Sequence, residues 1–514
     1  MKSIKKNQDQ IFPPFRRKGV GGEVLFLSLL FMFFATLSCG EGQGVRFYPA
    51  PEGEEPSPHY SVKINNKPLF VYQARVSAFP INMWPVSFQR PLEQTELAAF
   101  ACFDTDEAVD VEIESKIPVE TVTIRPASKN IKPQVVGNTI RFRVKEPCQL
   151  VVEINDHHHA LHLFVNPVER QKKNPDQYTL YFAAGRHQPG VIELKDNESV
   201  YIEGGAIVET MIRANNAQNI TIQGRGIIDA SSFERGKGSM IRLNECAGVK
   251  IEGVILKDSP GWALAMFEAK NVDIENVKLI GHWRYNADGI DIVNSQNVTV
   301  NNSFVRAFDD CICLKGVKTK NQSNVSNISV NQCVLWCDWG TAIQIGAETV
   351  ADSIHHNFFR NCDIIHFHFV AMGIHASDRA SIFDIHYENI GVEEPLIKNS
   401  YLDNPQNPIL DISKSGDYGT EKLPKTVLGR LFSLCIVEDL TWGNEKIRGK
   451  IYNIRYQNIH YHSDYFTKFT FTGYDENHDI SDLLFENIFI NGKKVTNGEE
   501  LISSNEYVRN VIFQ

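Results

Sequence analysis

A chain of 514 residues is long for one ordinary hydrophobic core, so we expect either two domains or a repeat architecture. An apolar fraction of 42% and a charged fraction of 22% are typical of a folded protein and exclude long disordered tracts. The formal net charge of −10 makes nucleic acid, itself a polyanion, an unfavourable partner.

The first 39 residues have the pattern of an export signal. Six basic residues precede an apolar run over residues 24–35, and small residues lead up to Cys39. This run is shorter than the roughly 20 residues of a membrane-spanning helix, so we predict a signal peptide over residues 1–38. A cysteine after small residues is similar to the lipidation site of bacterial lipoproteins, although Thr36 is unusual there. We expect a periplasmic or cell-surface lipoprotein, with Cys39 anchored to the outer membrane, or a secreted protein.

Residues 45–168 contain short segments in which apolar and polar side chains alternate, with turn residues between them. Such alternation predicts an antiparallel β-sandwich. A polar stretch over residues 169–177 then links this domain to the next. The segments are residues 60–65, 109–114, 139–144 and 161–165.

From residue 178 to residue 514 the pattern becomes a loose repeat of short apolar segments. Five of them begin at intervals of 29, 23, 26 and 30 residues, at positions 219, 248, 271, 297 and 327. One short β-rich segment in each repeat predicts an all-β solenoid, a right-handed parallel β-helix with a single continuous core. We expect this β-helix to be monomeric. The recurring asparagines are best interpreted as turn residues.

The ten cysteines show no paired spacing of the kind that binds zinc. We expect most of them to be small buried side chains, while a disulfide between Cys333 and Cys337 stays open. No metal or cofactor is expected.

The candidate catalytic residues lie in two segments, residues 286–292 and residues 308–315. Aligning the segments places Asp288 over Asp310 at an offset of 22 residues, about one coil. Neighbouring strands lie ~4.8 Å apart, so these two carboxylates should be adjacent, with Asp309 beside them if the backbone bends. Crowded carboxylates raise the pKa of at least one of them and can supply an acid beside a base, as glycoside hydrolysis requires. An Asp-rich turn or a calcium site is the structural alternative.

These motifs resemble those of the polygalacturonase-type family 28 glycoside hydrolases. Residues 286–289 are similar to the family's Asn-Thr-Asp-Gly, and residues 309–311 match its Asp-Asp-Cys. Residues 224–229, 240–253 and 259–262 resemble the segments that precede its active site, and the resemblance covers roughly residues 178–500. It implies an inverting hydrolase of α-glycosidic bonds in a polysaccharide. The sandwich before the helix is more similar to the dextranase and isopullulanase group.

The resemblance implies roles for the three acids. Asp309 would be the general acid that protonates the leaving oxygen. Asp288 and Asp310 would hold and deprotonate the attacking water.

Two departures from the family concern the substrate. The family's Gly-His-Gly is replaced by residues 340–342 (Gly-Thr-Ala), and its Arg-Ile-Lys by residues 373–375 (Gly-Ile-His). In the family that Arg and Lys bind the uronate carboxylate, for which a guanidinium is a natural partner. The candidates for substrate contact are Asn286, Lys315, Thr341 and His375, with Trp262 and Trp339 placed to stack on sugars. Further basic residues that could replace the missing pair are His282, Arg284, Arg306 and Arg379.

Several functions therefore stay open. A polygalacturonase-like, pectin-degrading enzyme leads on resemblance, and an α-glycosidase for a neutral glycan such as dextran, pullulan or an α-galactoside is second. A polysaccharide lyase on the same fold and a non-catalytic glycan-binding β-helix belong to other classes. Residues 393–440 could form a wall that decides between cleavage within chains and at chain ends.

Overall fold

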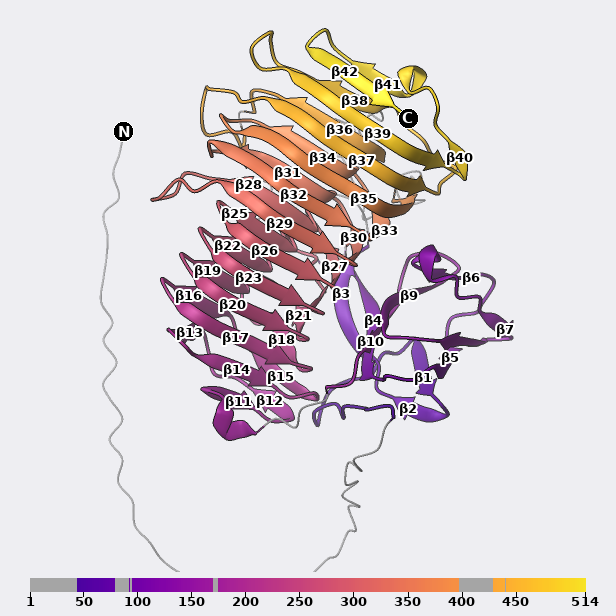
Figure 1. The fold of residues 1–514 in the computed structure, drawn as a ribbon. Coiled ribbons are helices and arrows are strands. Elements are labelled where there is room, and N and C mark those ends of the chain that lie inside the picture. The colour runs from indigo at the N-terminus through magenta and orange to yellow at the C-terminus, as the bar shows by residue number, and fades with distance from the viewer. Residues whose placement is uncertain (1–43, 79–91, 93–94, 170–173, 397–428, 440) are drawn as a thin grey trace, which may run out of the picture. The chain divides into compact units, whose positions relative to one another are not determined.

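The computed structural model describes residues 44–78, 92, 95–169, 174–396, 429–439 and 441–514. Its regular structure is almost entirely β (Figure 1), and the predicted all-β class, a right-handed parallel β-helix preceded by antiparallel sheets, is confirmed. The signal segment, Cys39 and residues 397–428 of the predicted wall lie outside the described residues, so these stay predictions. Within the described ranges, no helix has the length and apolar character needed to cross a membrane.

Two five-stranded sheets form the sandwich. In β1, Tyr60, Val62 and Ile64 are buried while Ser61 and Lys63 are exposed, as period-two alternation predicts. Neighbouring strands are antiparallel except β4 and β10, which pair in parallel. One sheet has the order β2 (Lys67–Leu69), β1 (Tyr60–Ile64), β5 (Val109–Ser115), β8 (Thr139–Val144), β7 (Gln134–Val136). The other has the order β3 (Tyr72–Ser77), β4 (Thr95–Asp104), β10 (Leu161–Asn166), β9 (Cys148–Ile154), β6 (Val122–Arg125).

The β-helix stacks its coils in chain order, from β11 near its start to β42 at its end (Figure 1). One strand of each coil joins a sheet that we call the site sheet, because it carries the candidate active site. In the described part of the chain its strands are β13 (Ile192–Leu194), β16 (Ile212–Asn215), β19 (Ile241–Asn244), β22 (Leu264–Phe267), β25 (Ile290–Val293), β28 (Ile312–Gly316), β31 (Thr341–Thr349), β34 (Val370–Ala376), β36 (Arg430–Ile436), β38 (Phe469–Thr472) and β41 (Ile502–Ser504).

The remaining strands of the coils form one larger sheet. They are β11 (Leu180–Phe182), β12 (Gly185–His187), β14 (Ser199–Ile202), β15 (Ala206–Glu209), β17 (Gln218–Gly224), β18 (Ile227–Asp229), β20 (Ala247–Glu252), β21 (Ile255–Lys257), β23 (Lys270–Glu275), β24 (Lys278–Ile280), β26 (Gln296–Asn301), β27 (Phe304–Ala307), β29 (Val325–Asn331), β30 (Val334–Cys337), β32 (Ser353–Arg360), β33 (Asp363–Phe367), β35 (Ser381–Pro395), β37 (Ile451–Tyr461), β39 (Ile480–Ile490), β40 (Lys493–Lys494) and β42 (Val508–Phe513). Short 3₁₀ turns lie at Ala127–Lys129, Pro175–Gln177 and Glu499–Leu501.

The spacing of the sequence repeat matches the register of the larger sheet. Residues 219, 248, 271, 297 and 327 occupy equivalent positions in successive coils. Asn271, Asn297 and Asn327 have left-handed φ angles of 56°, 56° and 57°, which asparagine tolerates better than most residues. The amide of Asn297 donates to Asn271 at 3.0 Å and accepts from Asn327 at 2.7 Å, so the asparagines link one coil to the next.

Cys333 and Cys337, for which a disulfide stayed open, are both free thiols in the apolar interior. The other described cysteines are also free.

The sandwich packs against one face of the β-helix. Aromatic side chains of β3, β4 and β10 share an apolar cluster with outward residues of β15, β18, β21, β24, β27, β30 and β33. Polar contacts frame this cluster, such as the hydrogen bond of 3.0 Å from Gln149 to Asn276. The larger sheet is therefore covered on this side, and the candidate site lies on the other sheet.

Candidate active site

The register of the site sheet brings the predicted acids together. Ile290 pairs with Ile312, and Ile312 with Ile343. The backbone N–H of Gly289 donates to the carbonyl of Asp310 at 2.8 Å. Asp288 and Asp310 thus occupy equivalent positions on neighbouring rungs, and the offset of 22 residues predicted from the sequence is the pairing that the sheet adopts.

A break in the alternation turns these carboxylates away from the core. Cys311 and Ile312 are consecutive residues, yet both lie in the apolar interior. The same is true of Ala263 with Leu264 and of Ala342 with Ile343 in the flanking coils. Gly289 occupies the position equivalent to Cys311 and leaves no room for a side chain, because an added Cβ would lie 2.4 Å from the carbonyl oxygen of Cys311 and 2.5 Å from the Val305 side chain. The residue just before each such pair therefore faces outward.

Asp309 lies beside this row because the following coil leaves room for it. A Cβ at Gly340 would lie 2.6 Å from Oδ1 of Asp309 and 2.8 Å from its carbonyl carbon, so a side chain at position 340 would displace the acid. The backbone of Asp309 is held by its N–H, which donates to Ala287 at 3.3 Å. Its carbonyl accepts from the Cys337 thiol at 3.2 Å.

Lys315 is the counter-ion of the cluster. Its Nζ lies 2.8 Å from Oδ2 of Asp288 and 3.0 Å from Oδ1 of Asp291, and all three side chains are buried. Asp288 and Asp291 already surround the ammonium, and the role of Lys315 as a substrate ligand stays a prediction. Among the described residues, no group of three or more His, Cys, Asp or Glu is arranged to hold a metal ion.

Sequence reasoning missed Asp291 as a member of the site. The signal was present, because Asp291 stands between the inward-facing Ile290 and Ile292 and must face outward on a regular strand. In the sheet it pairs with Cys313 on the next rung.

Burial and mutual repulsion raise the pKa values of the acids. Burial raises the pKa of Asp310 to about 7, and Asp288 adds to this. Lys315, the Thr341 N–H at 2.8 Å and the Cys313 thiol at 3.6 Å oppose it. Burial, Asp288 and Asp310 raise the pKa of Asp309 well above its ordinary range. The cluster therefore holds protons at a pH where an isolated Asp is ionised.

This electrostatics predicts how stability depends on pH. The folded-state pKa of Asp310, about 7, lies above the ordinary value of 3.8 for this carboxyl group. The contribution of Asp310 to the free energy of unfolding is therefore complete below about pH 4 and is lost as the pH rises through 7. We expect Asp310→Asn, which cannot titrate, to gain stability relative to the parent as the pH rises from about 5 to about 8, by at most about 1.4 kcal/mol per pH unit. Thermal unfolding across this range measures the difference, and a pH-independent difference would contradict the assignment.

The other predicted contact residues surround the acids. Thr341 is buried, and its backbone N–H rather than its side chain contacts Asp310. Trp262 lies one rung before Asp288, since Leu264 pairs with Ile290, and its ring lies 4.0 Å from Nζ of Lys315. Asn286 accepts a hydrogen bond of 3.3 Å from Arg235. Trp339 stacks on Phe308 at 6.0 Å, below the loop that carries Asp309.

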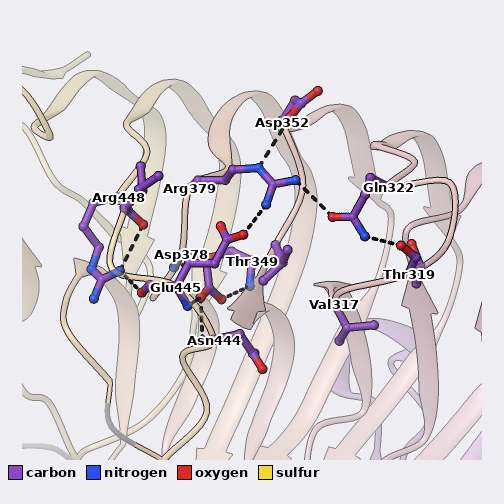
Figure 2. Close-up of polar contacts among 12 residues, drawn as sticks. Val317, Thr319, Gln322, Thr349, Asp352, Asp378, Arg379, Asn444, Glu445 and Arg448 are labelled. Atoms are coloured by element: carbon purple, nitrogen blue, oxygen red, sulfur yellow. Dashed lines mark hydrogen bonds and ion pairs between the residues drawn. The ribbon is translucent and has the colours of Figure 1, made fainter.

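His375 lies on the C-terminal side of the acids, in β34. Its Nε2 is 3.2 Å from Oδ2 of Asp439. Burial alone would lower the pKa of His375, but Cys435 and Asp439 raise it to about 10. The residues after Asp439 are anchored at Asp378, which accepts backbone N–H groups of Thr349, Asn444 and Glu445 at 2.9, 2.6 and 2.7 Å (Figure 2). A histidine paired with a carboxylate therefore borders the site on this side.

The four further basic candidates have other partners. Arg379 binds Asp352, Gln322 and Glu445 (Figure 2). Arg306 is buried between Asp338 and the Trp336 ring at the face covered by the sandwich. Arg284 pairs with Asp258 at 3.2 Å, and burial lowers the pKa of His282 to about 3. The structure places all four in structural contacts.

A pocket that the sequence did not reveal adjoins the acids on the N-terminal side. It has a volume of about 230 Å³ and is lined by Arg235, Gly236, Gly238, Ser239, Arg242, Pro260, Gly261, Trp262, Tyr285 and Asn286. Its two arginines come from a loop and from β19, far from the Asp motifs in sequence, so no local pattern connected them to the site.

Known proteins resemble parts of this chain. A probable polygalacturonase from Arabidopsis thaliana is 27% identical over 143 residues, which cover 25% of this chain and 30% of that protein. A probable rhamnogalacturonase A from Aspergillus oryzae is 30% identical over 124 residues, 23% of this chain and 24% of that protein. The chain thus spans about a quarter to a third of the length of these curated relatives.

The fold has a counterpart along most of the chain. The structure of Dex49A from Penicillium minioluteum superposes with a TM-score of 0.60 at 15% identity, covering 92% of this chain and 99% of that one. At the level of sequence families, residues 185–406 match the model of glycosyl hydrolases family 28. The segment that carries Asp288, Asp309 and Asp310 is therefore a match to family 28, and the resemblance predicted from the sequence motifs is confirmed.

Proposed function

We propose that the protein is a glycoside hydrolase that cleaves α-glycosidic bonds in a pectic polysaccharide, with inversion at the anomeric carbon. The observation that carries this proposal is the row of carboxylates on neighbouring rungs, Asp288 and Asp310 with Asp309 beside them, around the ammonium of Lys315. The match of residues 185–406 to family 28 and the partial similarity to a probable polygalacturonase support the same activity.

The proposed mechanism divides the work among the three acids. Asp309, whose pKa is raised well above its ordinary range by burial and by its two neighbours, would donate a proton to the leaving oxygen. Asp288, kept beside Lys315, and Asp310 would hold the water and accept its proton. Environments that push carboxyl pKa values apart are what allow one acid and one base to act at the same pH.

A neutral α-glycan is the second candidate substrate. The observation that favours it is the Gly-Ile-His at residues 373–375, where the resemblance implies Arg and Lys. His375 stands at this place, but it is paired with Asp439 and lacks the fork of donors with which arginine binds a carboxylate.

A comparison of substrates tests the proposal. We expect polygalacturonate to yield new reducing ends, and proton NMR of the first-formed product to show the β-anomer. Carboxyl-reduced pectin and dextran serve as neutral substrates in parallel reactions. Retention of the α-configuration would contradict the inverting mechanism, and cleavage of dextran alone would reverse the order of the substrates.

A further inference from the structure

The pocket on the N-terminal side of the acids contains a cation that the proposed mechanism does not use. Arg242, in β19, faces outward in the column that continues through Ala265 to Asp291 on successive rungs. Two rungs correspond to ~10 Å. This distance places the guanidinium beside the neighbouring part of a bound polymer rather than at the cleaved bond.

A stack of rings and cations holds Arg242 in place. Nζ of Lys315 lies 4.0 Å from the centre of the Trp262 ring, and this ring is stacked on Phe267 at 6.1 Å and 13°. On Phe267 lies the guanidinium of Arg242, with Cζ 4.1 Å from the ring centre. Flat stacking on an aromatic ring orients the guanidinium and limits its rotamers. The stack connects the counter-ion of the acids directly to the pocket.

Arg242 has no acidic partner among the residues that the structure describes. Its Nε donates to Oδ1 of Asn244 at 3.0 Å, which is a neutral acceptor. Burial alone lowers the pKa of Arg242, with no carboxylate opposing it. Arg213, its neighbour on the preceding rung, brings a second positive charge close to it. A half-buried pair of like charges is stabilised when an anion binds.

Arg213, which lies next to the pocket, and Arg235, which lines it, hold the surrounding backbone in place. Arg213 donates to the carbonyls of Ser239 and Met240 at 2.5 and 3.3 Å, which holds the loop before β19. Arg235 donates to the carbonyl of Tyr285 at 2.9 Å and to Asn286 at 3.3 Å. The ring of Trp262 forms part of the same pocket and offers an apolar surface to a sugar.

We propose that Arg242 is a specificity-determining residue that binds the carboxylate of a uronic acid unit next to the cleaved bond, on the N-terminal side of the acids. This inference rests on the proposed function and names the class of substrate, an acidic glycan. Arg242 thereby supplies, from the opposite side, the charge that residues 373–375 lack.

The test measures binding separately from cleavage. Oligogalacturonates and their carboxyl-reduced, neutral counterparts are titrated by calorimetry into the Asp309→Asn protein, alone and combined with Arg242→Gln, Arg242→Lys or the control Arg455→Gln. Arg455 is exposed on β37, in the larger sheet. We expect Arg242→Gln to weaken binding of the acidic ligand by about 10- to 100-fold and to leave the neutral ligand unchanged. Arg242→Lys should retain part of the affinity, and Arg455→Gln all of it.

The outcomes separate this inference from the proposed function. If Arg242→Gln weakens the binding of acidic and neutral ligands equally, or weakens neither, the role of Arg242 is overturned, even if the protein with Asp309 intact cleaves polygalacturonate. Cleavage of neutral glycans only, with no binding of oligogalacturonates by any variant, would overturn the proposed substrate and this inference together. Thermal unfolding of each variant verifies that the fold is intact.

Discussion

Asp309→Asn is expected to lower kcat on the cleaved polysaccharide by about 10²–10⁴-fold, the usual contribution of a general acid. An amide has nearly the size of the carboxyl group, so the contact with Gly340 is preserved, but it cannot give a proton to the leaving oxygen. KM should change little, because binding of the polysaccharide does not depend on that proton. Steady-state kinetics on the substrate identified in the comparison of substrates measures both kcat and KM.

A matched control separates loss of the acid from loss of the fold. Asp363 is another carboxyl group whose pKa burial raises, to about 6, but it hydrogen-bonds Ser128 on the face covered by the sandwich. Asp363→Asn should therefore retain full activity. If Asp309→Asn is also fully active, Asp309 is not the general acid, and the proposed mechanism is wrong.

Lys315→Met is expected to destabilise the protein by about 3–5 kcal/mol, the usual cost of removing one partner from a buried ion pair. Methionine fills much of the same volume, but it leaves Asp288 and Asp291 without their shared counter-ion. Without that positive charge the pKa values of the neighbouring carboxyls rise further, since Lys315 lowers those of Asp291, Asp309 and Asp310. The proposed base is then protonated and kcat falls as well. Urea unfolding gives the stability change.

Two comparisons test the assignment of Lys315. The exposed pair of Lys63 with Glu112, at 2.9 Å, provides a control, and Lys63→Met should change stability by at most about 1 kcal/mol. Adding Asp291→Asn to Lys315→Met should restore part of the lost stability, because it removes a buried acid that would otherwise carry an unpaired charge or have to take up a proton. If the double variant is no more stable than Lys315→Met alone, Asp291 is not the group that the lysine neutralises.

The proposed roles give the site sheet a distribution of charge along the coils. The carboxylates and Lys315 occupy its centre, Arg242 lies two rungs before Asp288 and Asp291, and His375 borders the site two strands after β28. Phe267 and Trp262 connect the first two of these regions. A polymer that extends across the rungs would therefore meet the positive charge of Arg242 on one side of the acids and the His375–Asp439 pair on the other.

The sequence alone determined the repeat, and with it the β-helix and the pairing of Asp288 with Asp310. Inward-facing side chains of successive coils must stack in one apolar core, so the spacing of apolar segments fixes the register. The same reasoning could have identified Asp291, because strand alternation places it outward between two core isoleucines.

Only the tertiary structure decided the direction of the acids and the surroundings of the site. Strict alternation would have turned Asp288 and Asp310 inward. Backbone geometry that no residue pattern encodes reverses this, at Gly289 after Asp288 and at the two consecutive core residues after Asp310. The roles of Arg242 and Lys315 depend on contacts between side chains from different coils. These contacts decide whether a charge is neutralised within the protein or can bind a substrate. Sequence spacing predicts which backbone positions are neighbours, whereas the partners of a charged side chain follow from three-dimensional packing.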